Sequence, residues 1–309
     1  MPTTIPSPSD EQFAALEARV AALEAGGPDP LPPTDPADLP YWGTPVWRDE
    51  FDGDLSGWNV RTRADLGLTI CAGEPSADAV KIEDGILHIR GEWLDDAPRP
   101  RDTSATGVDV LTHTTGYIDH RNLKPGNVTF AQTYGRWEIR CKTPTGPRTY
   151  GSLAAFWLRP DGRPGEIDIM EAWGYGDEPY GDQSYNADSA TTTIHTDTSG
   201  SGTKVIWTHR VLGGPMPVWD AFHTYAFEYT PTYCAMIVDG VELIRVTPED
   251  DGGTFLWDER YFGTPMHLRV NLHIGPSNDY WGVPDPDHKE LTVDPLDYQI
   301  EHIRIWAMP

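Results

Sequence analysis

The feature that most constrains this chain is the two-residue period of its apolar side chains from Tyr41 onward. Apolar residues alternate with charged or polar ones in RWEIRCK (136–142) and again in HLRVNLHI (267–274). The aromatic side chains of Tyr225, Phe227 and Tyr229 are also spaced two apart. Because successive side chains of a strand point to opposite faces, each segment predicts a half-buried β-strand.

Turn signals separate these segments. Asp84-Gly85 in IEDGILHI and Asp239-Gly240 in IVDGVELIRV each lie between two strand patterns, and this dipeptide favours a two-residue hairpin. No long helical periodicity follows residue 41. We therefore expect residues 41–309 to form one all-β domain of two stacked, curved antiparallel sheets.

The first 40 residues have a different composition. Residues 1–9 are rich in Pro, Ser and Thr and predict a flexible N-terminus, and residues 26–40 predict a stiff Pro-rich linker. Residues 10–25 between them predict a short helix with a coiled-coil seam, formed by Phe13, Leu16, Val20 and Leu23. Such a helix is marginal alone, so we expect a homotrimer or dimer; the alternative is a frayed tail without a partner.

Composition excludes some partners. The formal net charge of -25 argues against nucleic acid, because phosphates would be repelled. The three cysteines have no metal-ligand spacing, and we expect Cys141 and Cys234 to be buried free thiols. The N-terminus carries no secretion-signal pattern and no apolar run predicts membrane insertion, so synthesis in the cytoplasm is expected.

The segment GEIDIMEAWG (165–174) places three acids among apolar residues. Glu166 and Asp168 are two apart and share a strand face, whereas the odd spacing to Glu171 would point its carboxylate into the core at high cost. A β-bulge at Ile169-Met170 would return Glu171 to the face of the other two, leaving Ile167 and one bulge residue on the core side. We therefore predict three carboxylates on one open face.

Three neighbouring carboxylates suit one kind of chemistry. Their mutual repulsion should raise the pKa of at least one of them. Retaining glycoside hydrolysis requires one ionised carboxylate that attacks and another that holds a proton for the leaving oxygen. The alternative is a solvated acidic strand without a catalytic role.

These residues carry a family resemblance. GEIDIME resembles the motif of glycoside hydrolase family 16 in its bulge-containing form, which includes laminarinases and agarases. YGRWEIRCKTP, AAFWLRP and RVNLHIG match the family in order and spacing, and the resemblance covers residues 44–309. It implies a concanavalin A-like jelly roll and a retaining enzyme that cleaves β-linked glucan or galactan. It also implies that Glu166 is the nucleophile, Asp168 its helper and Glu171 the general acid/base.

The resemblance further implies substrate-binding residues. Sugar rings stack on aromatic faces. The candidates are Trp157, Trp173, His195, Tyr229, Asn271 and Trp281. Leu153 and Tyr229 stand where the family often has Trp. No cofactor is needed for catalysis, but the family often holds a structural calcium ion, for which Glu50 and Glu301 are the candidate ligands.

The layout of coil, Pro-rich spacer and terminal β domain resembles that of a phage tail fibre or minor tail protein. It implies a virion-associated glycosidase with other tail proteins as partners, acting outside the cell on a host polysaccharide. Two alternatives stay open on the same fold, namely a lectin-like glycan-binding module and a structural tail protein.

Overall fold

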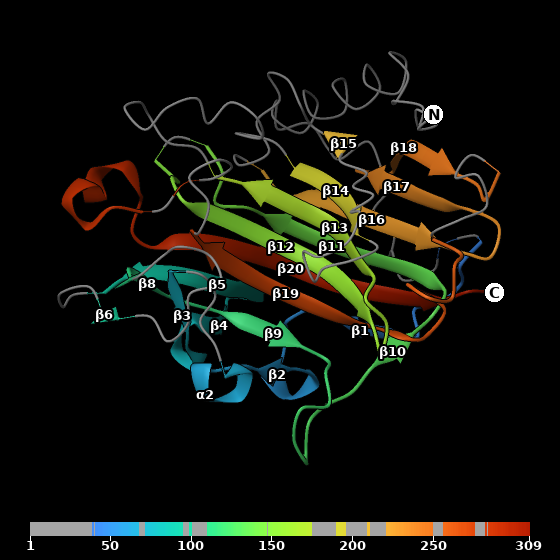
Figure 1. The fold of residues 1–309 in the computed structure, drawn as a ribbon, viewed down its shortest axis with the longest axis horizontal. Helices are drawn as coiled ribbons and strands as arrows, with labels where there is room; N and C mark the ends of the chain where they lie inside the picture. Colours follow the sequence, from blue (N-terminus) through green and yellow to red (C-terminus); the bar gives the residue numbers. More distant parts are fainter. Residues whose placement is uncertain are drawn as a thin grey trace.

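The computed structural model describes residues 39, 41–67, 72–94, 99–100, 110–146, 148–174, 190–195, 209–210, 221–249, 256–275, 282 and 284–309. Within these residues the chain forms two large β-sheets and a separate two-stranded ribbon (Figure 1). The predictions for residues 1–9, for the coil at 10–25 and for nearly all of the linker at 26–40 lie outside the described residues.

The larger sheet has ten strands, in which β20 runs the length of the domain. Its spatial order is β18 (Val241–Val246), β17 (Cys234–Val238), β16 (His223–Tyr229), β11 (Gly135–Lys142), β20 (Leu296–Ala307), β5 (Ile86–Trp93), β8 (His113–Thr115) and β3 (Gly73–Pro75). In addition, β1 (Trp47–Asp49) pairs with β20, and β4 (Val80–Glu83) pairs with β5.

The smaller sheet has eight strands. Its spatial order is β15 (His209–Arg210), β14 (Ala190–His195), β13 (Glu166–Trp173), β12 (Ser152–Pro160), β19 (Met266–Ile274), β9 (Tyr117–Asp119) and β2 (Asn59–Val60), with β10 (Ala131–Gln132) paired to β19. The separate ribbon consists of β6 (Arg99–Pro100) and β7 (Val110–Leu111).

Helices are short in the described part of the chain. They are α2 (Arg63–Leu66), η1 (Leu55–Gly57), η2 (Ala77–Ala79) and η3 (Pro286–Leu291). A capping box between Thr62 and Asp65 starts α2, and Gly67 ends it in the left-handed conformation. Among the described residues, no helix combines the length and the apolar character needed to cross a membrane.

Both Asp-Gly hairpins are confirmed. Asp84 and Gly85 have φ of 52° and 78°, and Asp239 and Gly240 have φ of 48° and 76°, as a tight turn with two left-handed residues requires. One detail of the fold prediction is wrong, since β3 and β8 pair in parallel whereas the other ladders are antiparallel. Nothing in the local sequence of these three-residue strands indicates the direction of their partner.

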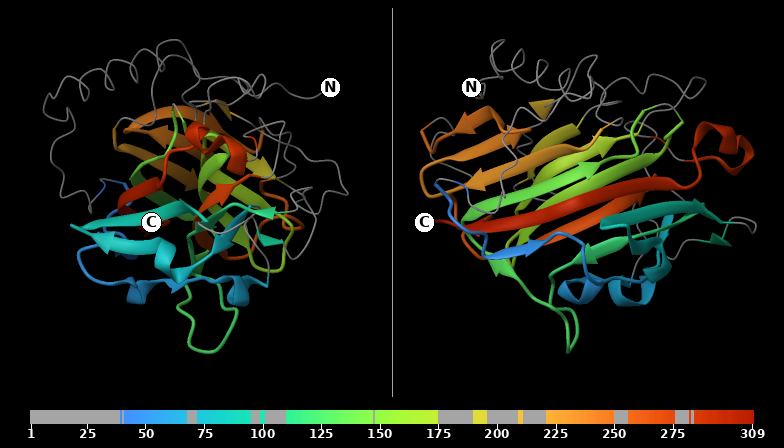
Figure 2. Two further views of the ribbon diagram at one scale, coloured as in Figure 1. Left: turned by 90° about the vertical axis from the view of Figure 1, so that its left-hand side faces the viewer. Right: turned by 180° about the vertical axis from the view of Figure 1, so that it is seen from behind.

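The core lies between the two large sheets, which stack face to face (Figures 1 and 2). The alternation within β11, β16 and β19 is confirmed, because the alternating large apolar side chains of each strand are all buried in one cluster. Cys141 and Cys234 are buried free thiols, as predicted, and Cys71 lies outside the described residues. The second set of side chains on each strand therefore faces outward, and on the smaller sheet this outer face carries the acids.

Candidate active site

The predicted β-bulge is present in β13. On β12, the adjacent residues Phe156 and Trp157 pair with Met170 and Asp168, so that Ile169 is the extra residue. The ladder with β14 shifts register at the same step, between Asp168 and Glu171. The inserted residue changes the phase of the alternation, which allows Glu171 to leave the core.

The core side of the bulge differs from the prediction in one respect. Both Ile169 and Met170 are fully buried in the main core, where only one of them was expected. The glycines that flank the strand are fixed by close approach. A Cβ on Gly165 would lie 2.5 Å from the carbonyl oxygen of Tyr261, and one on Gly174 would lie 2.2 Å from that of Thr149. These contacts hold both ends of β13 against neighbouring backbone.

The outer face of the smaller sheet is called the site face below. It is formed by the side chains of β13, β12, β14, β19 and β9 that point away from the core. Glu166 and Asp168 lie here with His195 of β14, and one ligand atom from each lies within 4.8 Å of the others. His195 Nε2 is 3.0 Å from Asp168 Oδ2, and the Thr193 hydroxyl donates to Glu171 Oε2 at 3.0 Å. Cross-strand partners on β14 thus hold two of the acids.

The environment changes the proton affinity of two acids. Burial, and then the charge of Glu166, raise the pKa of Asp168 well above its usual value; its side chain is only 8% exposed. Burial and the neighbouring Asp168 likewise raise the pKa of Glu171 well above its usual value, against the Thr193 hydrogen bond. Glu166 instead has a cation beside it, since Arg159 Nε lies 3.5 Å from Glu166 Oε2. The site therefore raises the proton affinity of Asp168 and Glu171, whereas Glu166 lies beside a guanidinium group.

Two tryptophans lie beside the acids on the site face. Trp157 is partly exposed and packs on a small apolar cluster of Leu153, Ala155 and Trp173, separate from the main core. Trp157 Nε1 donates to Asn271 Oδ1 at 2.8 Å, and Trp173 Nε1 donates to Thr191 Oγ1 at 3.0 Å. Hydrogen bonds thus fix the orientation of both rings.

The remaining predicted residues have different outcomes. Asn271 lies on the site face through β19, fully buried beneath Trp157. Tyr229 belongs to β16 of the other sheet, is 1% exposed within the main core, and donates its hydroxyl to the Leu256 carbonyl. Its assignment to substrate binding is wrong, because its strand presents it to the interior. Trp281 lies outside the described residues.

The residues proposed for calcium do not fit that ion. Arg304 donates two hydrogen bonds to the Glu50 carboxylate, at 2.8 and 2.7 Å, and Arg140 pairs with Glu301. Calcium needs six or more oxygen ligands, and these carboxylates are already neutralised by guanidinium groups. Among the described residues, the acid and histidine group that could gather around a metal is instead Glu166, Asp168 and His195.

Several residues near the acids were not among the predicted site residues. Arg159 and Thr193 contact them, yet neither was selected. The alternation itself could have found both, because Arg159 is two residues after Trp157 and Thr193 two before His195. Tyr117 and Asp119 reach the same face through β9, which pairs with β19, and no local signal predicts that pairing.

Comparison with known proteins agrees with this geometry. The family profile of glycosyl hydrolases family 16 matches residues 115–285, more than half of the chain and all of the acid-bearing strand. A beta-glucanase from Rhodothermus marinus is 33% identical over 168 residues, which cover 48% of this chain and 50% of that protein. An endo-1,3-1,4-beta-glycanase, EglC, from Rhizobium meliloti (strain 1021) is 28% identical over 203 residues, covering 65% of this chain and 35% of that protein. The chain spans half or less of the length of the curated relatives it matches.

The fold is shared with solved structures. The catalytic domain of an endo-1,3-beta-glucanase (laminarinase) from Thermotoga petrophila RKU-1 superposes with a TM-score of 0.61 at 22% identity, covering 86% of this chain and 98% of that one. Identity at this level shows a common architecture and does not by itself define the substrate. With a profile match that covers more than half of the chain and includes the bulged strand with its three acids, the chain belongs to family 16 of the glycosyl hydrolases.

Proposed function

We propose that this protein is a retaining endo-β-glucanase that hydrolyses 1,3-linked or mixed 1,3-1,4-linked β-glucan. The observation that carries the proposal is the β13 bulge, which brings Glu171 to the site face together with Glu166 and Asp168. The relatives named as a beta-glucanase and an endo-1,3-1,4-beta-glycanase support glucan over galactan as the substrate class.

In the proposed reaction, Glu166 attacks the anomeric carbon and Glu171 protonates the leaving glycosidic oxygen. The raised pKa of Glu171 supports the acid role, because the group keeps its proton at a pH where an ordinary glutamate is ionised. After the leaving sugar departs, Glu171 becomes the base that activates water, and water releases the sugar from Glu166. This double displacement requires carboxyl groups about 5–5.5 Å apart.

Asp168 supports the nucleophile in this scheme. Its raised pKa favours the protonated form, which can donate a hydrogen bond to the ionised Glu166. His195, the cross-strand partner of Glu166, contacts the Asp168 carboxyl group and fixes its orientation. Trp157, which is partly exposed and held in place by Asn271, offers an apolar ring face on which a glucosyl unit can stack, and the buried Trp173 packs beside it.

The test is product analysis on a panel of soluble β-1,3-, mixed β-1,3-1,4- and β-1,4-glucans and galactans. We expect new reducing ends and internal cleavage of the first two, and turnover lost in the Glu166→Gln variant while glucan binding persists. Binding without any new chain ends in the parental protein would contradict the hydrolase and favour a lectin-like module.

We also propose that residues 10–25 oligomerise the chain, as expected for a tail-borne enzyme delivered by a virion to a host polysaccharide. The support is the coiled-coil spacing followed by a Pro-rich segment. Light scattering of the full chain and of a chain starting at Tyr41 tests this. A trimer or dimer that becomes a monomer on truncation is expected, and two monomers would refute it.

A further inference from the structure

Arg269 is a buried cation that forms no ion pair with the residues the structure describes. It lies on the site face in β19, is 9% exposed, and its guanidinium carbon sits 4.4 Å from the centre of the Trp157 ring. Among the described residues no carboxylate comes within ion-pair distance of it, and its Nε atom is buried without a hydrogen-bond partner. Its polar contact is with Tyr117, whose hydroxyl it approaches from the neighbouring strand.

Burying an unpaired guanidinium group costs folding free energy unless a ligand supplies the missing partner. A buried charge is ordinarily paired or hydrogen-bonded throughout. Burial lowers the pKa of Arg269, yet a guanidinium stays charged in proteins. The stacking on Trp157 compensates for only part of the lost hydration. The position therefore has unused capacity for an anion.

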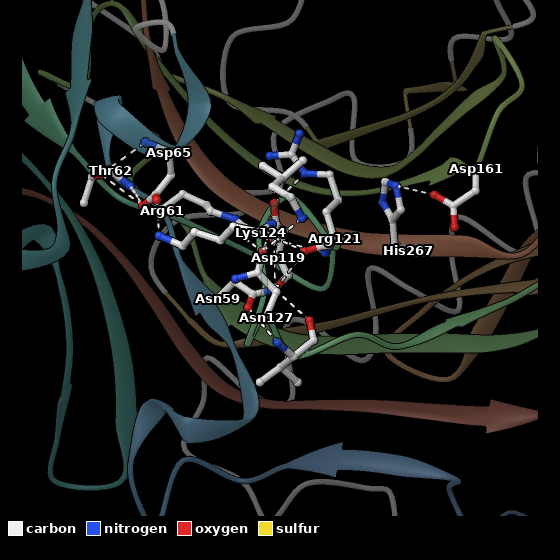
Figure 3. Close-up of polar contacts among 12 residues, drawn as sticks. Asn59, Arg61, Thr62, Asp65, Asp119, Arg121, Lys124, Asn127, Asp161 and His267 are labelled. Atoms are coloured by element: carbon white, nitrogen blue, oxygen red, sulfur yellow. Dashed lines mark hydrogen bonds and ion pairs between the residues drawn. The ribbon is translucent and has the colours of Figure 1, made fainter.

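The charged groups within electrostatic range of Arg269 include two further arginines, Arg121 and Arg159, and one carboxylate, that of Glu166. Arg121 follows β9, where its Nε pairs with Asp119, but its Nη2 is buried without a partner. Asp119 also binds Arg61, at 2.7 Å, so one carboxylate is shared by two guanidinium groups (Figure 3). The group of Arg61, Arg121 and Asp119 thus keeps a net positive charge.

The base of this cationic group is rigid. Asn59 on β2 bonds the carbonyls of Arg121 and Val128, and Asn127 accepts hydrogen bonds from Arg61 and from the amides of Leu123 and Lys124 (Figure 3). These bonds anchor the loop between β9 and β10, which projects from one end of the sandwich (Figure 1). Arg61 and Arg121 are therefore held in place before any ligand arrives.

We propose that Arg269, flanked by Arg121 and Arg159, forms a subsite for an acidic substituent, a carboxylate or a sulfate ester, on the β-glucan chain. This inference rests on the proposed glucanase function and narrows its substrate to an acidic glycan. The planar guanidinium group binds such oxygen pairs through two parallel hydrogen bonds, and Asn271 Nδ2, which is buried and unpaired, adds a donor beside it.

The strand register gives the distance to the reaction centre. Arg269 pairs with Trp157, and Trp157 pairs with Asp168, so Arg269 is two strands from the acids. Adjacent strands are about 4.8 Å apart, which places the subsite roughly 10 Å from Asp168. The acidic group would therefore lie on a sugar next to the one attacked, with Trp157 stacking between the two positions.

The test compares three matched β-1,3-glucan oligosaccharides, one neutral, one with a carboxylate at C6 of a single sugar, and one with a sulfate ester there. Binding is measured by calorimetry on the Glu166→Gln variant, which prevents cleavage, and hydrolysis is measured on the parental protein. We expect at least one acidic form to bind about 10-fold or more tightly than the neutral form, as charge-assisted hydrogen bonds allow. The acidic oligosaccharide that binds more tightly than the neutral one identifies the recognised group as a carboxylate or a sulfate ester.

Substitution then locates the effect. Arg269→Met should reduce the preference for the acidic form to near unity, whereas Arg269→Lys should keep part of it through its charge. Arg245→Met on the exposed edge of the larger sheet removes the same charge far from the site and should leave the preference unchanged. If Arg269→Met fails to fold, the preference of the parental protein for the acidic oligosaccharide, compared with that of Arg269→Lys, still tests the subsite.

Equal binding of all three oligosaccharides, or a preference that survives Arg269→Met, would overturn the subsite. Failure of the glucanase proposal has a different result. In that case no β-glucan is cleaved, while the preference for an acidic form in the binding assay is still present.

Discussion

The outer faces of the two sheets differ in how completely their buried charged side chains are paired. On the larger sheet, Arg136 bonds Glu228 at 2.8 Å and Glu138 at 2.6 Å, and Arg304 grips Glu50 with two bonds. On the site face, three acids of one strand are grouped together and the nearby Arg269 has no carboxylate partner among the described residues. Buried charge is thus paired on the larger sheet, whereas on the site face paired groups such as Asp119 with Arg61 lie beside clustered acids and an arginine without a carboxylate partner among the described residues.

The pKa values follow this difference. Burial would raise the pKa of Glu138, but the neighbouring His302 and Arg136 lower it to about 2. On the site face burial and like charge act together, so the pKa values of Asp168 and Glu171 are both raised. A face that only stabilises the fold satisfies its charges, whereas unsatisfied charge is typical of a functional site. The comparison supports assigning catalysis to the smaller sheet.

The largest effect should come from Glu171→Gln. Loss of the proton donor should lower kcat/KM on β-glucan by roughly 10²–10⁴-fold. The loss should be smaller on an aryl β-glycoside, whose leaving group needs little protonation. Steady-state kinetics on both substrates measure this. Glu242→Gln, on an exposed ion pair of β18, is the matched control and should leave kcat/KM unchanged. Near-parental activity of Glu171→Gln on glucan would contradict the assignment of Glu171 as the general acid.

The same substitution on the two faces should give different stabilities. Arg136→Met leaves two buried carboxylates without their cation and should cost about 3–5 kcal/mol of unfolding free energy. Arg269→Met removes a charge that has no carboxylate partner among the described residues and should change stability by less than about 1 kcal/mol, or increase it. Urea unfolding of both variants measures the difference. Equal destabilisation would show that the two faces are not distinct in this sense.

The contributions of Glu171 on the site face and of Glu138 on the larger sheet to the free energy of unfolding should change with pH in opposite directions. The folded-state pKa of Glu171 is raised, so its contribution is complete below its unfolded value near 4.5 and is lost as the pH rises through the folded value. Glu171→Gln should therefore unfold at higher temperature than the parent at pH 8 and equally at pH 4. A gain of about 1 kcal/mol corresponds to roughly 2–4 °C.

Glu138 is the counterpart on the larger sheet. Its folded-state pKa of about 2 lies below the unfolded value of 4.5, so its contribution is complete above 4.5 and is lost as the pH falls toward 2. Glu138→Gln should be less stable than the parent at pH 7, with the difference shrinking in acid. Thermal scans across this range check both signs, and parallel curves for the two variants would contradict the comparison.

The smallest effect should come from calcium. Because Glu50 and Glu301 are paired with arginine, millimolar calcium or a chelator should shift Tm by less than about 1 °C. Calorimetric scans with and without the ion measure this. A rise in Tm of several degrees with calcium would show that the protein has a calcium site and that calcium displaces the arginines from these carboxylates.

Features set by neighbouring residues could be predicted from the sequence. Alternation defined the strands of β11 and β19, Asp-Gly defined both tight hairpins, and the odd spacing of Glu171 required the bulge. Each of these depends on contacts within a few residues or on a strict two-residue period. The acid-bearing face followed from them.

Features set by long-range pairing could not be predicted. The two-residue spacing of the aromatic residues around Tyr229 predicts that one face of their strand is buried. It does not predict which sheet that strand joins. The ion pairs of Glu50 with Arg304 and of Asp119 with Arg61 join residues far apart in the chain. The isolation of Arg269 depends in the same way on which strands surround it. These properties arise only when the sheets are assembled.

The central claim is that Glu166 is the nucleophile of a double displacement on the face of β13. The most direct measurement is the reaction of Glu166→Ala with an aryl β-glycoside of a β-1,3-glucan oligosaccharide in the presence of azide. Azide entering the space left by the carboxylate should restore turnover and give the α-glycosyl azide, inverted at the anomeric carbon. Hydrolysis by Glu166→Ala at the parental rate without azide would contradict the claim.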